Sequence, residues 1–565
     1  MKRKHLFIVL MGSLLATGCQ TTGTTQPADE PRAAGQAGHA HMHDDHAVHA
    51  GGDIGAVDFE VACDTAVQGD FDRALGLMHH MMYAQARSEF ENIAEADPEC
   101  AMAHWGIATT LFQPLWGTRP SDEELNQGWE AIQRAQELAE TERERSLIHA
   151  TAEFFREPDT ADFPIRIERW ATGMEEAFEQ YPDDADTAAL YALSRLTLAQ
   201  QVEERDPLHD EAEAILRRIH ERKPQHPGAI HYSIHATDAD GRAENALDMV
   251  EAYADIAPEV PHALHMPSHI YVRLGDWPAV IHWNRRSADA ALDHPVNGDV
   301  SHHYIHALDY LVYAYLQRGE DGRARAVFEE LADEGPHQQS FVSAFHFAAM
   351  PARYVVEQRR WEDAVALEAR SPAYLPWDES AWAEGLTWFA KGLGAVRTGD
   401  AEIARLAERR LASLRDQARD EGDEHFATYL EVDRLILAGT TAHAHGRAEQ
   451  AEEHMRSAAS LERTVEKHPV TPGALLPPNE ALGDLLMAQD RPADALAAYQ
   501  ASDDIWPGRY NTLLGAARAA VAADRAQAAS EYYGRLVEQA GDSDRPSLEE
   551  ARRYLERGEI MTGGQ

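Results

Sequence analysis

The sequence predicts an all-α protein, a superhelical solenoid of stacked helical hairpins. From about residue 57 onward alanine, leucine, glutamate and arginine dominate, and no strand-like alternation of polar and apolar residues persists. A repeat runs through this part, because Pro224 and Pro258 end similar segments and Ala212 and Ala246 precede them at the same distance. A single hairpin cannot bury its apolar face alone, so such repeats stack into one continuous core.

The same spacing recurs near both ends of the chain, from Ala86 to Pro98 and from Ala495 to Pro507. A period of about 34 residues with two helices per unit resembles the tetratricopeptide repeat, and the "HMPSHI" segment at 265–270 resembles a group of bacterial tetratricopeptide proteins. The resemblance implies roughly ten hairpins and a concave groove that binds a protein or peptide partner. We expect one array over residues 57–370, with a histidine-lined groove, and a second over 371–565.

The N-terminus has the pattern of a targeting segment. Residues 1–18 resemble a bacterial lipoprotein signal peptide, with a basic start, an apolar stretch from Leu6 to Ala16, and Cys19 directly after Gly18. The resemblance implies lipidation at Cys19 and a place on the periplasmic face of the cell envelope. Gln20, in place of the aspartate of inner-membrane retention, favours the outer membrane. The alternative is a plain secretory signal with an unmodified Cys19.

Residues 19–56 contain little apolar material and predict a disordered, histidine-rich tether. Its imidazoles and carboxylates either capture Cu, Zn or Ni or belong to a polar spacer. The five histidines of the tether are His39, His41, His43, His46 and His49.

Charge and motifs limit the remaining functions. The formal net charge of −45 argues against nucleic acid or anionic lipid as partners, so membrane contact is expected only through the N-terminal lipid. The sequence has no phosphate-binding loop, no Gly-x-Ser-x-Gly elbow and no His-Glu-x-x-His motif. It indicates no catalytic residues and favours a non-enzymatic protein, although it does not decide the question.

Two cysteines remain besides Cys19, and both lie just before the first helix of neighbouring repeat units. Equivalent helix starts are close in stacked hairpins, and an oxidising compartment permits pairing. We therefore predict a disulfide between Cys63 and Cys100.

Histidines recur at fixed distances before the turns of four successive units, which begin at Gly241, Gly275 and Gly319 and near Arg359, where His346 takes the thirteenth position. Counted back from a turn, the thirteenth, tenth and sixth positions share one helix face, which is expected to be the inner one. Pro267 interrupts the helix that carries three of these histidines and weakens the placement of His262 and His265. The candidate metal ligands at these offsets are His231, His235, His262, His265, His269, His306 and Asp309.

Three interpretations of this stripe stay open. The pairs His231/His235 and His265/His269 could converge on one Zn, Cu or Fe ion. His262, His306 and Asp309 could then be further ligands or could orient the ligands by hydrogen bonds. The stripe could instead hold a polar or anionic small ligand, or consist of structural histidines in a peptide groove. The sequence favours a membrane-anchored periplasmic scaffold. The alternative is a transition-metal-binding protein or metal-dependent enzyme that uses the same groove.

Overall fold

The computed structural model describes residues 54–562, apart from 116–118, 158–160, 203, 240, 254–255, 333, 544 and the side chains of 558–562. Residues 52–565 form one compact unit. The predicted signal peptide, Cys19 and the five tether histidines lie outside the described residues. The last residues assigned to the tether belong to the folded part, because the carbonyl of Ile54 accepts a hydrogen bond from His80 Nε2 (3.0 Å) and Ala56 N–H donates to Gln225 O (2.8 Å).

The described residues form helices, and the pairing of β type among them consists of two isolated bridges. Within the described part of the chain, the helices include none that is long and apolar enough to cross a membrane. The α-helices are α1 Gln68–His79, α2 Tyr83–Ala96, α3 Ala101–Phe112, α4 Asp122–Leu138, α5 Glu142–Phe155, α6 Phe163–Gln180, α7 Ala185–Ala199, α8 Asp206–Arg222, α9 Pro227–Thr237, α10 Leu247–Tyr253, α11 Pro261–His265, α12 Pro267–Leu274, α13 Trp277–Ala291, α14 His302–Gln317, α15 Asp321–Ala332, α16 Phe341–Glu357, α17 Trp361–Ala366, α18 Ala381–Thr398, α19 Ala401–Asp420, α20 Glu424–Ala444, α21 Ala448–Glu462, α22 Pro478–Ala488, α23 Pro492–Ile505, α24 Tyr510–Ala522, α25 Ala526–Gln539 and α26 Pro546–Thr562. Short 3₁₀ helices are η1 Thr65–Val67, η2 Ala243–Ala246 and η3 Trp377–Glu379.

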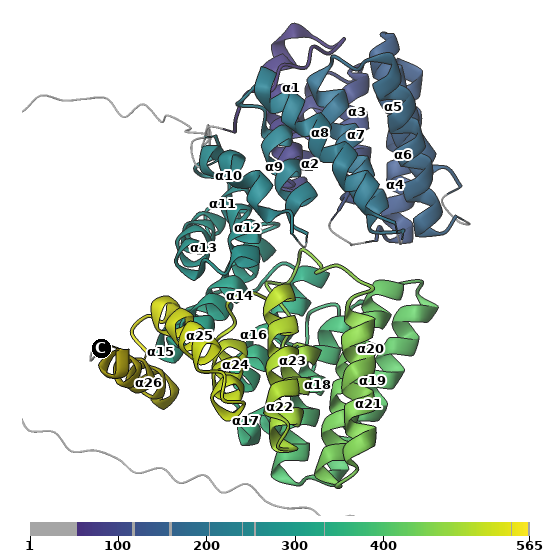
Figure 1. The fold of residues 1–565 in the computed structure, drawn as a ribbon. Coiled ribbons are helices and arrows are strands. Elements are labelled where there is room, and N and C mark those ends of the chain that lie inside the picture. The colour runs from purple at the N-terminus through teal and green to yellow at the C-terminus, as the bar shows by residue number, and fades with distance from the viewer. Residues whose placement is uncertain are drawn as a thin grey trace, which may run out of the picture. The chain divides into compact units, whose positions relative to one another are not determined.

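Successive helices pair into antiparallel hairpins, which confirms the predicted all-α solenoid of tetratricopeptide type (Figure 1). The first helix of a hairpin also packs on the first helix of the next, as α14, α16 and α18 do. This packing continues across residue 370, so the division into two arrays at that point stays a prediction. The hairpins are α1–α2, α3–α4, α5–α6, α7–α8, α9–α10, α11/α12–α13, α14–α15, α16–α17, α18–α19, α20–α21, α22–α23 and α24–α25, and α26 follows them.

The turns from which the histidine offsets were counted are real turns. Gly241, Gly275, Gly319 and Arg359 all have a positive φ, between 56° and 75°. Gly275 ends α12 in the left-handed conformation, and a Cβ built there would lie 3.3 Å from the carbonyl oxygen of Pro507. A glycine therefore serves both the turn and the close approach of the C-terminal hairpins.

Pro267 divides the helix of the "HMPSHI" segment without breaking its direction. α11 ends at His265 and α12 starts at Pro267, while Met266 between them keeps helical angles of φ −52° and ψ −41°. Proline is tolerated because it occupies the first turn of α12, where its missing N–H is not needed. His262, His265 and His269 therefore stay on one helical path.

The C-terminal hairpins pack against the middle of the chain. Trp277 Nε1 donates to Gly508 O (3.1 Å), and Gln317 Oε1 accepts from the backbone N–H of Tyr510 (2.9 Å). Gly541 N–H donates to the carbonyl of Arg318 (3.1 Å). The turns that follow α12 and α14 are thus close to a part of the same chain that is remote in sequence.

Cys63 and Cys100 form a disulfide, with their Cα atoms 4.8 Å apart. The bond ties the segment before η1 to the residue that precedes α3, at a sequence separation of 37.

We expect the C63S/C100S variant to lose about 4 kcal/mol of unfolding free energy, the chain-entropy value for a loop of this length. Urea denaturation monitored by circular dichroism measures the loss, and reduced wild-type protein should match the variant. Two titratable thiols in the oxidised, unfolded wild type would contradict the pairing.

Candidate metal centre

The predicted histidines meet in the interior of the protein and not on an open surface. They come from the first helices α9, α11/α12 and α14 of three successive hairpins. All six are buried, with at most 9% of the residue exposed. The sequence predicted that they line a concave groove; the structure buries them on the face where the first helices meet. The six are His231, His235, His262, His265, His269 and His306.

A connecting segment of the chain closes the groove. We call residues 463–477, between α21 and α22, the roof segment. Its Lys467 ammonium contacts Asp238 Oδ2 at 2.9 Å, and its Pro469 carbonyl accepts from the Tyr310 hydroxyl at 3.0 Å. Arg353 Nη1 donates to Gly473 O at 2.9 Å. The roof segment therefore lies directly beside the face on which the sequence predicted a partner-binding groove.

Three imidazoles converge at one point, which we call site A. It consists of His265 on α11, His269 on α12 and His306 on α14, with one nitrogen from each within 4.8 Å of the others. His265 Nε2 lies 2.9 Å from His269 Nε2 and also 2.9 Å from His306 Nε2. Nitrogens that share one ion at about 2.0–2.1 Å lie roughly 3–4 Å apart, so this spacing suits a single metal ion.

The other ring nitrogen of His265 and of His269 donates to a fixed acceptor. His265 Nδ1 lies 2.7 Å from Asn284 Oδ1, and the Asn284 amide group must face this way because its Nδ2 donates to Val280 O. His269 Nδ1 lies 2.8 Å from Asp238 Oδ2, and an ionised carboxylate only accepts hydrogen bonds. In neutral rings the proton therefore sits on Nδ1 in both, and each Nε2 carries a lone pair.

In His306 the proton also sits on Nδ1, because two hydrogen bonds in series connect this nitrogen to Asp309. Its Nδ1 lies 2.7 Å from His346 Nε2, and His346 Nδ1 lies 3.1 Å from Asp309 Oδ2. Because Asp309 accepts from Nδ1 of His346, His346 Nε2 accepts from His306, whose Nε2 then carries a lone pair. Asp309 also binds Arg353 Nε at 3.1 Å. Asp309, one of the predicted candidates, thus lies behind His346 and orients a ring of site A indirectly.

The rings of site A are neutral near pH 7. Burial lowers the pKa of His265 and of His306 well below the ordinary value of 6.5, and neighbouring histidines lower it further. Burial also lowers the pKa of His269, although Asp238 opposes this. Three lone pairs therefore face one another at hydrogen-bond distance, an arrangement that repels unless a cation stands between them.

A second group lies beside the first, and we call it site B. His231 and His235 on α9 and His262 on α11 each offer one nitrogen within 4.8 Å of the others. The ring centres of His235 and His269 are 5.8 Å apart, and those of His262 and His265 are 6.0 Å apart. The predicted joining of His231/His235 with His265/His269 on one ion is thus replaced by two neighbouring sets of three.

A third group differs from the other two because it contains a carboxylate. Both His79 Nε2 (2.9 Å) and His226 Nε2 (3.2 Å) lie close to Asp186 Oδ1, although His226 Nε2 makes no hydrogen bond among the described residues. His79 Nδ1 pairs with the Tyr232 hydroxyl at 3.0 Å, and His226 Nδ1 accepts from Ala229 N–H at 3.2 Å. The negative charge of Asp186 thus lies between the two imidazoles.

A cavity of about 710 Å³ reaches the edge of the two sites. His235 and Asp238 form part of its wall, together with Lys467 and His468 of the roof segment. A second cavity, of about 380 Å³, lies across the roof segment and is lined by Arg273 and Arg353. Solutes can therefore approach the histidines from the His235 side.

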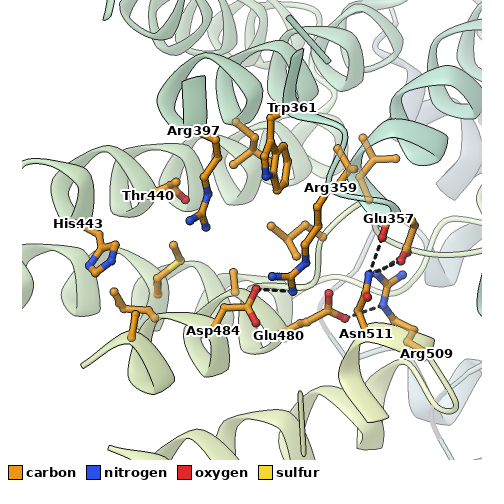
Figure 2. A pocket seen from close by; sticks show the side chains of 18 residues that line it. Glu357, Arg359, Trp361, Arg397, Thr440, His443, Glu480, Asp484, Arg509 and Asn511 are labelled. Atoms are coloured by element: carbon orange, nitrogen blue, oxygen red, sulfur yellow. Dashed lines mark hydrogen bonds and ion pairs between the residues drawn. The ribbon is translucent and has the colours of Figure 1, made fainter. Parts of the chain in front are cut away.

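A separate hollow lies on the inner face of the later hairpins, away from the histidines (Figure 2). It combines a cavity of about 60 Å³ with an adjoining one of about 680 Å³. Arg359 Nη2 binds Asp484 Oδ2 there at 2.8 Å, whereas the Arg397 guanidinium lies over the Trp361 ring, 5.7 Å from its centre. The residues that line both cavities are Glu357, Arg359, Arg397, Asp484 and Asn511.

Apart from Asp309, the residues that orient the ligands were not among the predicted candidates. His346 precedes the turn at Arg359 by the same offset at which His306 precedes the turn at Gly319, so the spacing put it on the same helix face but not in the ligand set. Asp238 lies just after α9, and Asn284 lies on a second helix, so neither follows the first-helix pattern. Lys467 is 229 residues from the carboxylate that it contacts, and no local pattern predicts that contact.

Comparisons with known proteins add little to this geometry. None of the protein-family models matches the chain, and neither does any curated protein. Among solved structures, the crystal structure of yeast Tom70 aligns over 88% of this chain and 96% of that chain, with 10% sequence identity and a TM-score of 0.31. So distant a similarity leaves the site to be interpreted from its own residues.

We expect acid to destabilise the protein through its buried neutral histidines. Burial lowers the pKa of His468 to about 3 and that of His80 to about 4. Above pH 6.5 each is neutral in both states, whereas below it the unfolded chain takes up a proton that the folded chain refuses. Each should therefore lower the unfolding free energy by about 2 kcal/mol between pH 7 and pH 5. Urea titrations at several pH values measure this.

The variant H468Q is the matched control for that experiment. Glutamine can still accept the hydrogen bond from Val470 N–H that His468 Nδ1 receives at 3.1 Å, but it does not titrate. Its stability should fall by about 2 kcal/mol less than that of the wild type over the same pH range. Identical pH profiles would show that His468 is not held neutral.

Proposed function

We propose that this protein binds a transition-metal ion at site A, inside a helical-repeat scaffold. The observation that carries the proposal is the set of three Nε2 lone pairs directed at one another, each fixed by a hydrogen bond from Nδ1 on the far side of its ring. Metal-bound histidines typically donate their other N–H to a carboxylate, carbonyl or similar acceptor, which fixes the tautomer.

The ligand set favours zinc, copper or iron. Neutral imidazole suits all three, whereas magnesium and calcium prefer oxygen. Three histidines leave at least one coordination position for water or a substrate, as in catalytic zinc sites. Metal-dependent catalysis is therefore chemically compatible with this centre, and the described residues do not identify a substrate.

The proposal extends to the N-terminus, where it rests on the sequence alone. We propose that lipidation at Cys19 anchors the chain to the bacterial outer membrane on the periplasmic side, and that the histidine-rich tether collects metal ions. An oxidising envelope compartment agrees with the Cys63–Cys100 disulfide.

The first test measures metal content in the H265A/H306A variant. The parent should be the full-length chain in which the five tether histidines are alanine, so that tether-bound metal does not contribute. We expect the parent to retain transition metal through purification and the variant to lose the site A ion, because two of its three ligands are gone. Inductively coupled plasma mass spectrometry gives the metal-to-protein ratio.

Two comparisons make that test decisive. H149A removes an imidazole whose side chain is 54% exposed and should leave the metal content unchanged. Circular dichroism should show that H265A/H306A keeps its helices. A folded variant with the metal content of its parent would refute the proposal.

Loss of an orienting residue should weaken binding without removing a ligand. Asn284 is fully buried and holds His265 Nδ1, and leucine has a similar volume but no acceptor. We expect N284L to lower the metal affinity by about 10–100-fold, the usual effect of losing such a partner. Competition with a chromophoric chelator measures the affinity, and an unchanged value would show that the tautomer of His265 does not depend on Asn284.

A protein-binding scaffold is the second candidate, and the hollow of Figure 2 favours it. Arg397 makes its cation–π contact there without an ion pair to any carboxylate among the described residues, so its charge is available to a partner. The metal measurement separates the two functions, since a pure scaffold would keep its metal content when the site A histidines are replaced.

A further inference from the structure

Site B resembles site A in how the proton of an imidazole ring is placed, as His231 shows. His231 Nδ1 lies 2.6 Å from the carbonyl oxygen of His79, which can only accept a hydrogen bond. The proton of the neutral ring is therefore on Nδ1. His231 Nε2 is buried and has no hydrogen-bond partner among the described residues. A buried lone pair without a partner costs free energy that a bound cation would remove.

His235, one helical turn further along α9, supplies a second nitrogen of the site. Its Nε2 is likewise buried and unpartnered within the described part of the chain. The ring centres of His231 and His235 are 5.0 Å apart, as expected for i,i+4 positions on one helix face. Two adjacent imidazoles on one helix form a preorganised pair of ligands for one ion.

His262 supplies the third nitrogen from the next hairpin. Its ring centre is 5.0 Å from that of His231, and one nitrogen from each of the three rings lies within 4.8 Å of the others. Burial and the neighbouring histidines lower the pKa of His231 and of His262 well below 6.5, and they lower that of His235 to about 3. All three rings are neutral near pH 7, which is the form that binds metal.

We propose that site B binds a second transition-metal ion, held by His231, His235 and His262 beside the ion of site A. The inference rests on the proposed function, because it treats the two sites as halves of one centre. It assigns different roles to the halves. Site A is enclosed, whereas His235 borders the 710 Å³ cavity, so the site B ion is the one that water or a small anion from the cavity can reach as a further ligand.

The contrast with the His79 group supports this assignment. In that group the Asp186 carboxylate lies between the imidazoles, 2.9 Å from His79 Nε2 and 3.2 Å from His226 Nε2. In site B no carboxylate belongs to the converging set, which consists of three histidines. The Nε2 atoms of His231 and His235, both buried and unpartnered among the described residues, suit a cation, and the cavity beside His235 gives that cation an entry path.

The test is equilibrium dialysis against Zn²⁺, with the tether-alanine full-length chain as parent. We expect two zinc ions per parent chain, one in H231A/H262A and one in H265A/H306A. H235Q, which preserves size and polarity, should also bind one ion and covers the case in which the double variant fails to fold. H149A should bind two, and circular dichroism checks the fold of each variant.

Each other outcome overturns the inference in a recognisable way. One zinc in the parent, lost only in H265A/H306A, would remove site B and leave the proposed function standing. No zinc in any protein would remove both. Loss of both ions in a folded H235Q or H231A/H262A would show that the two sets do not act as separate sites.

Discussion

The site depends on how the histidine protons are directed. Each ring of site A gives its Nδ1 proton to an acceptor outside the cluster, and these acceptors come from three different elements: Asn284 on α13, Asp238 after α9, and His346 on α16. The register of four successive hairpins therefore determines where the three lone pairs point. A shift of one hairpin relative to the next would change a tautomer and, with it, the charge that the centre can hold.

Burial of the carboxylates beside the histidines costs free energy, and ion pairs offset this cost. Asp238 is buried and faces Arg273 Nε and Lys467 Nζ, at 2.8 and 2.9 Å, while Asp309 faces Arg353. Burying a carboxylate without such partners would cost several kcal/mol. Lys467 belongs to the roof segment, so the contact that neutralises Asp238 also closes the groove. A peptide-binding groove has to stay open, whereas a metal centre gains from exclusion of water, and the roof segment favours the second use.

The sequence predicted which face of a helix each side chain lies on better than how deeply that side chain is buried. The repeat period placed the helices, and the turns at Gly241, Gly275 and Gly319 placed six histidines on one face, because helix periodicity is a local property. The burial of the histidines was not predicted, because it depends on packing between hairpins and on contacts such as that of Lys467 with Asp238, which are remote in sequence. Asp309 was placed on the correct face, but an offset does not give a residue's distance from the cluster. The division into two sets of three depends on contacts between hairpins, which a period does not contain.

The position of the carboxylates distinguishes the His79 group from the proposed metal centre. In the His79 group the carboxylate of Asp186 lies between the two imidazoles, close to one ring nitrogen of each. In site A the carboxylates of Asp238 and Asp309 lie at the periphery and draw the protons outward. The same residue types thus form two different clusters. The middle of the His79 group holds an anionic carboxylate, whereas the middle of site A is lined by lone pairs that can bind a cation. Amino-acid composition cannot distinguish the two clusters, because they differ in which ring nitrogen of each histidine, the inner or the outer one, faces the carboxylate.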